Sequence, residues 1–155
     1  MVFNPKTWLV RKTAPTAAVE VAKSSSKQRG DAAEDAALVH LQAQGLRLVQ
    51  RNFKTPGRGG GEIDLIMREP DGTLVFVEVR QRVSASQGGA GASITHAKQQ
   101  RIVLAARHFL LRLRSEPPCR FDVVLIQGPN AALGGSSATA SITWLRAAFD
   151  ASATF

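Results

Sequence analysis

A glutamate stands inside an apolar run near the middle of the chain. Glu78 lies in the sequence Leu-Val-Phe-Val-Glu-Val at 74–79, where a buried carboxylate is costly unless a partner compensates it. Strand alternation places Arg80 on the same face as Glu78, and it places Glu62 beside Asp64 on the preceding strand. If the two strands pair through the turn between them, Asp64 and Glu78 approach each other. Carboxylates about 4 Å apart repel by about 4 kcal/mol at an effective dielectric of 20, so they need a proton, a cation or distance.

Three arrangements can relieve this repulsion. Arg80 and other arginines can pair with the carboxylates in a buried network, which is a purely structural role. A divalent cation can bind between them, because Mg²⁺ and Mn²⁺ prefer carboxylate, carbonyl and water oxygens. The carboxylates can also face solvent. Glu34 favours the metal site, because it shares a helical stripe with Leu38 and Leu41 and is therefore aimed at the sheet.

Helices and strands must position these residues. Helical spacing of apolar residues, strand alternation and turn residues together predict the elements. They are a helix over 28–44, strands over 46–53, 62–68 and 73–80, a helix capped by Thr95, a strand over 120–127, and a strand or helix over 142–149. This order predicts an α/β protein with a mixed central sheet flanked by helices. Within 62–68, strict alternation places Ile63, Leu65 and Met67 on one face and Asp64 with Ile66 on the other.

Length and charge limit the function classes. The 155 residues suffice for one domain over 28–150, and the net charge of +8 favours a polyanionic partner. Residues 1–27 carry five basic residues and one acid, which predicts a flexible basic tail. Cys119 is the single cysteine, so a disulfide framework is excluded and a reducing cytoplasm is expected. We expect no membrane span, because the apolar runs are far shorter than about 20 residues.

The second predicted helix and its C-terminal extension are basic. Five basic residues follow one another without an acid between them, which is typical of either a solvated helix face or a surface that contacts phosphates. They are Lys98, Arg101, Arg107, Arg112 and Arg114.

Several ordered segments carry a family resemblance. They are Gly30-Asp31-Ala32-Ala33-Glu34, Arg51-Asn52-Phe53, Gly61-Glu62-Ile63-Asp64-Leu65-Ile66, the strand over 74–80, Lys98 with Arg101-Ile102, and Arg120-Phe121-Asp122-Val123-Val124. With these segments the chain resembles the PD-(D/E)XK, or restriction-endonuclease-like, nuclease superfamily, and more closely the bacterial YraN-like family of small endonucleases. The resemblance covers about residues 29–126.

The resemblance implies a restriction-endonuclease-like α-β-β-β-α-β core and a Mg²⁺- or Mn²⁺-dependent endonuclease that hydrolyses DNA, including branched DNA. Asp64 and Glu78 match the two metal-binding acids, and Glu34 resembles the helix acid that completes the site in Holliday-junction resolvase-like members. Arg80 stands where the superfamily usually has lysine; it can stabilise phosphoryl charge but cannot serve as a base. A homodimer would offer a junction one site per strand.

Other residues have weaker assignments. Glu62 is expected either to support the site by orienting water or a ligand, or to be a solvated acid at a strand start. Lys98 is either an ordinary surface lysine or a residue of the site. In the second case it contacts phosphate or supplies the amine that is missing because position 80 is an arginine. Arg58, in a glycine-rich loop, and Arg82 and Arg101 are further candidates for nucleic-acid binding.

Two other function classes stay open at this stage. One is a nucleic-acid-binding module that keeps the nuclease fold without turnover. The other is an adaptor that binds an acidic partner through the basic tail over 1–27.

Overall fold

The predicted order of helices and strands is confirmed. The protein is represented by a computed structural model that describes residues 16–57, 59–82, 94–128 and 141–154. Its elements are α1 (Thr16–Ala43), β1 (Arg47–Lys54), β2 (Glu62–Arg68), β3 (Leu74–Arg82), α2 (His96–Leu110), β4 (Cys119–Gln127), β5 (Ser141–Phe149) and the 3₁₀ helix η1 (Ala151–Thr154). The segment of undecided type over 142–149 is therefore a strand.

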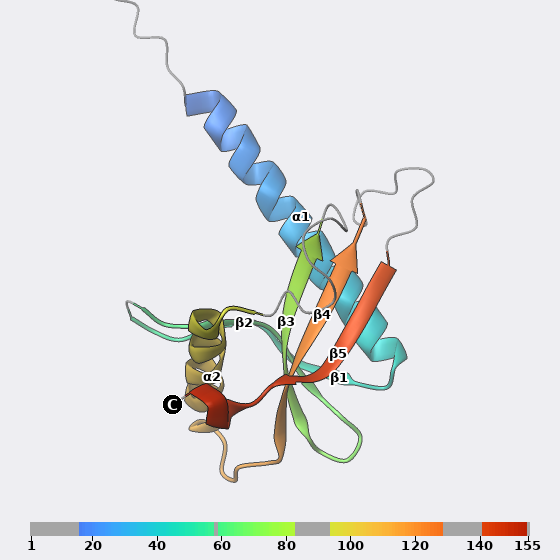
Figure 1. Ribbon diagram of the computed structural model, residues 1–155, viewed down its shortest axis with the longest axis vertical. Helices are drawn as coiled ribbons and strands as arrows, with labels where there is room; N and C mark the ends of the chain where they lie inside the picture. Colours follow the sequence, from blue (N-terminus) through green and yellow to red (C-terminus); the bar gives the residue numbers. More distant parts are fainter. Residues whose placement is uncertain (1–15, 58, 83–93, 129–140, 155) are drawn as a thin grey trace, which may run out of the picture.

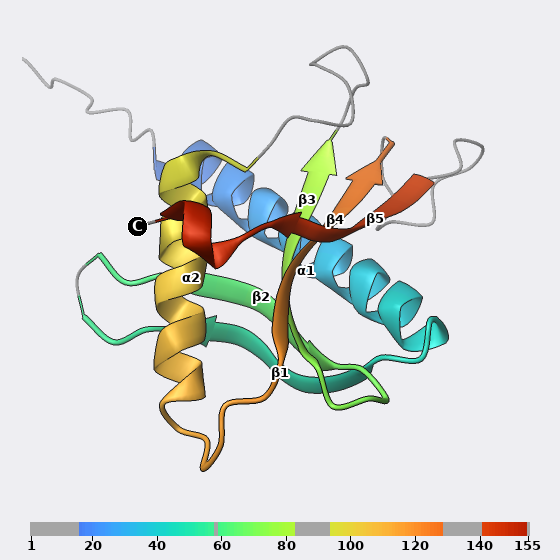
Figure 2. The ribbon, with the colours of Figure 1, turned by 60° about the horizontal axis from the view of Figure 1, so that its bottom comes forward.

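The five strands form one mixed sheet in the order β1-β2-β3-β4-β5 (Figure 1). Strands β3 and β4 are parallel and α2 connects them, whereas the other neighbouring strands are antiparallel. The two helices cover opposite faces of the sheet (Figure 2). On the α1 face, Ala37 and Leu41 pack with Val75 and Val77; on the α2 face, Ile102 packs in a cluster with Phe76. The fold is thus the predicted α/β sandwich.

The turn between β2 and β3 sets the register of this hairpin. Gly72 has a φ of 94°, and Asp71 Oδ1 accepts a hydrogen bond of 2.9 Å from Thr73 N. The ladder runs from Arg68↔Leu74 to Leu65↔Val77 and ends there. Asp64 and Glu78 are consequently the first pair beyond the ladder, at the point where the two strands separate.

The prediction of strict alternation in β2 is wrong at Asp64. Leu65 packs on the α1 face, but Ile63, two residues away, packs on the α2 face. The same switch occurs in β1 around Asn52, which has a φ of 48°. Asparagine adopts this left-handed conformation more easily than most residues, so β1 and β2 bend together at this level. The bend gives the segment around Asp64 access to both layers of the protein.

Helix α1 begins at Thr16 rather than at residue 28. Residues 16–27 were predicted to belong to the flexible tail, but the helix includes them because no proline or glycine occurs between Pro15 and Gly30. The rest of the predicted tail, residues 1–15, lies outside the described residues. Neither helix in the described part of the chain is long and apolar enough to span a membrane.

A buried ionic network joins β5 to β4 on the α1 face. Asp122 is fully buried and accepts hydrogen bonds from Arg120 Nε at 2.8 Å, Trp144 Nε1 at 2.9 Å and Ala147 N at 2.9 Å. Arg120 also pairs with Glu69 at 2.8 Å. The pairing of β4 and β5 shifts register at this level, and Ala147 has a φ of 47°. Asp122 therefore accepts the hydrogen bond of a backbone amide at the bulge, where the regular pairing of the two strands is interrupted.

Candidate functional site

The candidate site lies where β2 and β3 separate. Glu78, on β3, has 6% of its surface exposed. Asp64, on the bend of β2, accepts a hydrogen bond of 2.7 Å from Val79 N through Oδ2, in place of the missing ladder bond. The carboxyl groups of Asp64 and Glu78 are close enough to share a hydrogen bond. The approach of these two acids, expected from the sequence, is therefore present in the fold.

Lys98 brings a positive charge to this pair from α2. Thr95 caps the helix, as predicted, and its Oγ1 accepts a hydrogen bond from Lys98 N at 3.3 Å. The Lys98 side chain turns to β3, where Nζ lies 3.1 Å from Glu78 Oε2. That oxygen has no aligned hydrogen-bond donor among the described residues, so the contact is an ion pair without hydrogen-bond geometry. This contact does not fit the interpretation of Lys98 as an ordinary surface lysine.

The electrostatic environment favours a proton on the Asp64–Glu78 pair. Burial and the charge of Glu78 raise the pKa of Asp64 to about 7 from its ordinary 3.8, although the hydrogen bond from Val79 N and the charge of Lys98 act against the rise. Burial also raises the pKa of Glu78, and Lys98 again opposes it. Near neutral pH this pair is therefore poised between holding a proton and carrying two negative charges.

Glu34 reaches the neighbourhood of Asp64 from α1. Burial, followed by the charge of Asp64, raises the pKa of Glu34, while a hydrogen bond from Asn52 and the charge of Arg51 lower it. Arg51 Nη2 lies 3.7 Å from Glu34 Oε2 and 2.7 Å from Asp35 Oδ1. Helix α1 thus supplies a third acid on the α1 side of the bend.

Arg51 and Asn52 were not predicted as site residues. Both lie within a segment that carried the family resemblance, and an asparagine inside a strand is itself unusual. That signal could have indicated a special backbone position.

The remaining predicted residues lie around the pair rather than in it. Arg80 is exposed, yet it is near enough for its charge to lower the pKa of Glu78. Glu62 is half-buried and pairs with Lys54 at 3.2 Å, and it is near enough for its charge to raise the pKa of Asp64. Arg101 is exposed on α2. Arg58 lies outside the described residues, and for Arg82 only its place at the end of β3 is described.

The donor atoms suit a hard cation. Glu34 Oε2 and Glu78 Oε2 are buried without a hydrogen-bond donor among the described residues. Buried carboxylate oxygens without donors are costly, and carboxylates are ligands of Mg²⁺ and Mn²⁺. In the described ranges, however, no three acidic, histidine or cysteine side chains are grouped closely enough to hold one metal ion by themselves. The residues therefore fit a cation held by one or two carboxylates and completed by water or phosphate, the usual arrangement for Mg²⁺.

Comparison with known proteins gives the family. The model of the uncharacterised protein family UPF0102 matches residues 33–126, which include the acids of the site, Arg80 and α2. The chain belongs to UPF0102, the YraN family. A UPF0102 protein of Polaromonas naphthalenivorans is 63% identical over 142 residues, covering 92% of both chains. One of Albidiferax ferrireducens is 64% identical over 127 residues, covering 82% of this chain and 91% of its own. The resemblance seen in the sequence is thereby confirmed at the level of the family.

The raised pKa of Asp64 predicts that this UPF0102 protein is less stable when the group ionises. The folded-state pKa of about 7 lies above the ordinary 3.8, so stability from this group is lost progressively as the pH rises from about 3.8 to about 7. We expect Asp64→Asn to raise the free energy of unfolding by about 1–3 kcal/mol at pH 8 in metal-free buffer and much less at pH 5. Thermal melts at both pH values measure this. An equal gain at both would show that burial of the charge is not the cause.

Proposed function

We propose that this UPF0102 protein is a metal-dependent endonuclease that hydrolyses phosphodiester bonds in DNA, with branched DNA as its substrate. The observation that carries the proposal is the Asp64–Glu78 pair, half-buried at Asp64 and buried at Glu78, beside the Lys98 ammonium group, with no aligned hydrogen-bond donor to Glu78 Oε2 among the described residues. A purely structural pair would be expected to have its oxygens satisfied, as Asp122 has.

Asp64 and Glu78 would hold Mg²⁺ or Mn²⁺, with Glu34 as the further acid on the α1 side. The cation would polarise the scissile phosphate and lower the pKa of a bound water. Because the carboxyl pair is poised near neutral pH between holding one proton and carrying two negative charges, ionisation of Asp64 is required before the pair offers its full charge.

The cationic side chains complete the chemistry. Lys98 and Arg80 flank Glu78 and are suited to stabilise negative charge that develops on the phosphoryl oxygens. As an arginine, Arg80 contributes charge rather than proton transfer. The net charge of +8 favours a polyanionic substrate, and the single cysteine suits a cytoplasmic protein. A homodimer would present two such sites to the strands of a junction.

Cleavage of linear, nicked and four-way-junction DNA in Mn²⁺ or Mg²⁺ tests this function. We expect wild-type protein to cleave the junction and Asp64→Asn to be at least about a hundredfold slower. Asp71→Asn is the matched control, because it makes the same change in an exposed turn and keeps an acceptor for Thr73 N. Equal rates for wild type and Asp64→Asn would contradict the proposed site.

A nucleic-acid-binding module without turnover is the second candidate. It is favoured by the lack of a ready group of three metal ligands in the described ranges. Titration calorimetry separates the two functions, since a binding module would show salt-sensitive DNA affinity without uptake of Mn²⁺.

A further inference from the structure

We infer that one flank of α2 binds the backbone of a duplex DNA arm that leads away from the site. This flank consists of Lys98, Arg101, His108 and Arg112, which follow one another at spacings of three, seven and four residues. Such spacings place side chains on one side of a helix. Although α2 ends at Leu110, Leu111 keeps a helical conformation and Arg112 N donates to Phe109 O, so Arg112 continues the line. We call these four residues the α2 flank.

The α2 flank begins in the proposed site. Lys98 contacts Glu78, and Arg101, His108 and Arg112 are exposed beyond it. The β1–β2 hairpin passes beneath this side of the helix (Figure 2), and a Cβ on Gly61 would lie 1.8 Å from Arg101 O. Arg112 stands over the ring of Phe53 from β1, 5.7 Å from its centroid. The hairpin thereby fixes the helix as a straight edge along which a rigid substrate can lie.

Lys98 pairs with Glu78, but the two arginines of the α2 flank are not neutralised within the described part of the chain. Arg101 and Arg112 form no ion pair with a carboxylate there, whereas Arg51, Arg120 and Arg146 each do. Residues 96–114 contain no acid at all. Exposed arginines without a carboxylate partner are complementary to a phosphate backbone.

The length of the α2 flank fits a short stretch of duplex DNA, and its side chains favour duplex over single-stranded DNA. At about 1.5 Å per residue, Lys98 and Arg112 are about 21 Å apart along the helix. This corresponds to about six base pairs at about 3.4 Å each. Single-strand binding surfaces use exposed aromatic rings for base stacking. The aromatic residues next to the flank, Phe53 and Phe109, are both buried.

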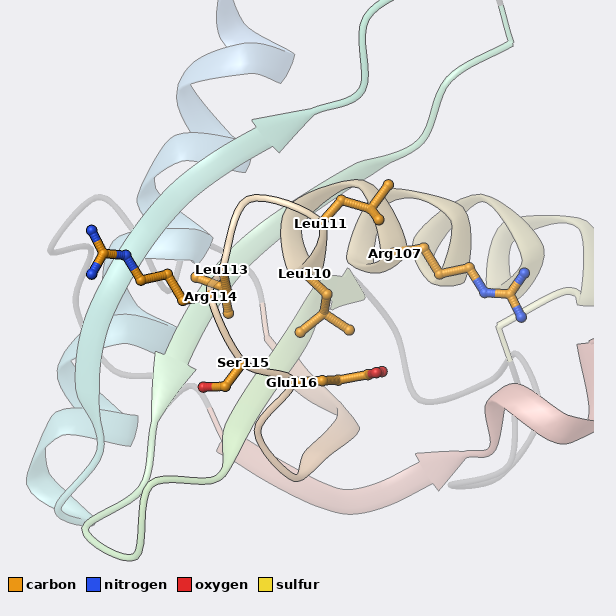
Figure 3. Close-up of a pocket in the computed structure, with 7 residues that line it drawn as sticks. All are labelled: Arg107, Leu110, Leu111, Leu113, Arg114, Ser115 and Glu116. Carbon is orange, nitrogen blue, oxygen red and sulfur yellow. The ribbon is translucent and has the colours of Figure 1, made fainter.

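The opposite side of α2 supplies an internal control. Arg107 and Arg114 line a groove of about 460 Å³ with Leu110, Leu111 and Leu113. Figure 3 shows Arg107 directed back along the helix and Arg114 directed away from the groove at the other end. Leu111, which is 82% exposed, lies between this side and the α2 flank. A charge change here leaves the α2 flank intact.

The test is the salt dependence of binding to a short labelled duplex, measured by fluorescence anisotropy in EDTA. We expect Arg101→Gln/Arg112→Gln to reduce the slope of log Kd against log salt by about two and to weaken binding about tenfold or more. We expect Arg107→Gln/Arg114→Gln, with the same loss of charge, to leave most of the slope unchanged. Thermal melts check that both variants fold.

Equal slopes for the two double variants, or tighter binding of single-stranded than of duplex DNA, would overturn the inference. A larger effect of the groove-side variant would also overturn it. The choice of DNA rests on the proposed function, but the two can fail separately because EDTA removes cleavage from the measurement. Loss of duplex binding in the α2 flank variant, with no cleavage by wild type in Mn²⁺, supports the flank and refutes the nuclease. Cleavage of DNA by wild type in Mn²⁺, together with unaltered duplex binding by the α2 flank variant, supports the nuclease and refutes the flank.

Discussion

Replacing Lys98 by methionine is expected to slow DNA cleavage at pH 7 by at least about a hundredfold. The ammonium group lies 3.1 Å from Glu78 Oε2 and is the largest influence that lowers the pKa of Glu78; it also lowers that of Asp64. Without it, both pKa values rise and the carboxyl pair is protonated at neutral pH. The same change removes a charge suited to the developing phosphoryl oxyanion.

The pH profile distinguishes these effects from simple loss of substrate affinity. Because higher carboxyl pKa values require higher pH for ionisation, the rate for Lys98→Met should rise at a higher pH than that of wild type, with part of the loss recovered near pH 9. Lys98→Arg should keep the wild-type midpoint, since it keeps the charge. A uniform loss with an unshifted profile would show that Lys98 acts on the substrate alone.

Replacing Asp122 by alanine is expected to cause the largest loss of stability. The fully buried carboxylate accepts hydrogen bonds from Arg120, the Trp144 indole and the Ala147 amide, so its removal leaves the indole and the amide without their acceptor and Arg120 with Glu69 as its remaining partner. Breaking a buried pair in this way costs about 3–5 kcal/mol. For a chain of this size we expect the Tm to fall by about 6–20 °C.

Asp71→Ala is the comparison for Asp122→Ala. Asp71 is exposed and accepts one local hydrogen bond in a turn, so its loss should cost less than about 1 kcal/mol. Asp122→Asn should fall between the two, because an amide keeps one acceptor but not the charge. A melting temperature of Asp122→Ala close to that of wild type would mean that β5 is held on β4 by other contacts.

Much of the fold could be predicted because its signals are local. The strand over 62–68 was predicted with the bounds of β2, and Thr95 was recognised as the cap of α2 from its type and position. Asp64 and Glu78 lie on two strands that a single tight turn connects, and this was enough to predict that the two acids approach each other. Their chemical roles stay predictions.

The parts that could not be predicted depend on backbone conformation or on distant partners. The bend at Asp64 requires the positive φ of Asn52 on the neighbouring strand, and alternation within one strand contains no sign of it. The network around Asp122 joins Glu69, Arg120 and Arg146, whose sequence separations reach 77 residues. The predicted start of α1 is misplaced because the basic composition of residues 1–27 indicated a tail, although no proline or glycine between Pro15 and Gly30 breaks a helix.

The bend shared by β1 and β2 links the assembly of the site to the folding of the whole domain. Glu34 arrives from the layer on one side of the sheet and Lys98 from the layer on the other, and the bend at Asp64 is where the two meet. A chain on which either helix has not yet docked therefore lacks part of the constellation. For the proposed nuclease, a newly synthesised or partly unfolded molecule would therefore be unable to cut DNA until both helices have docked.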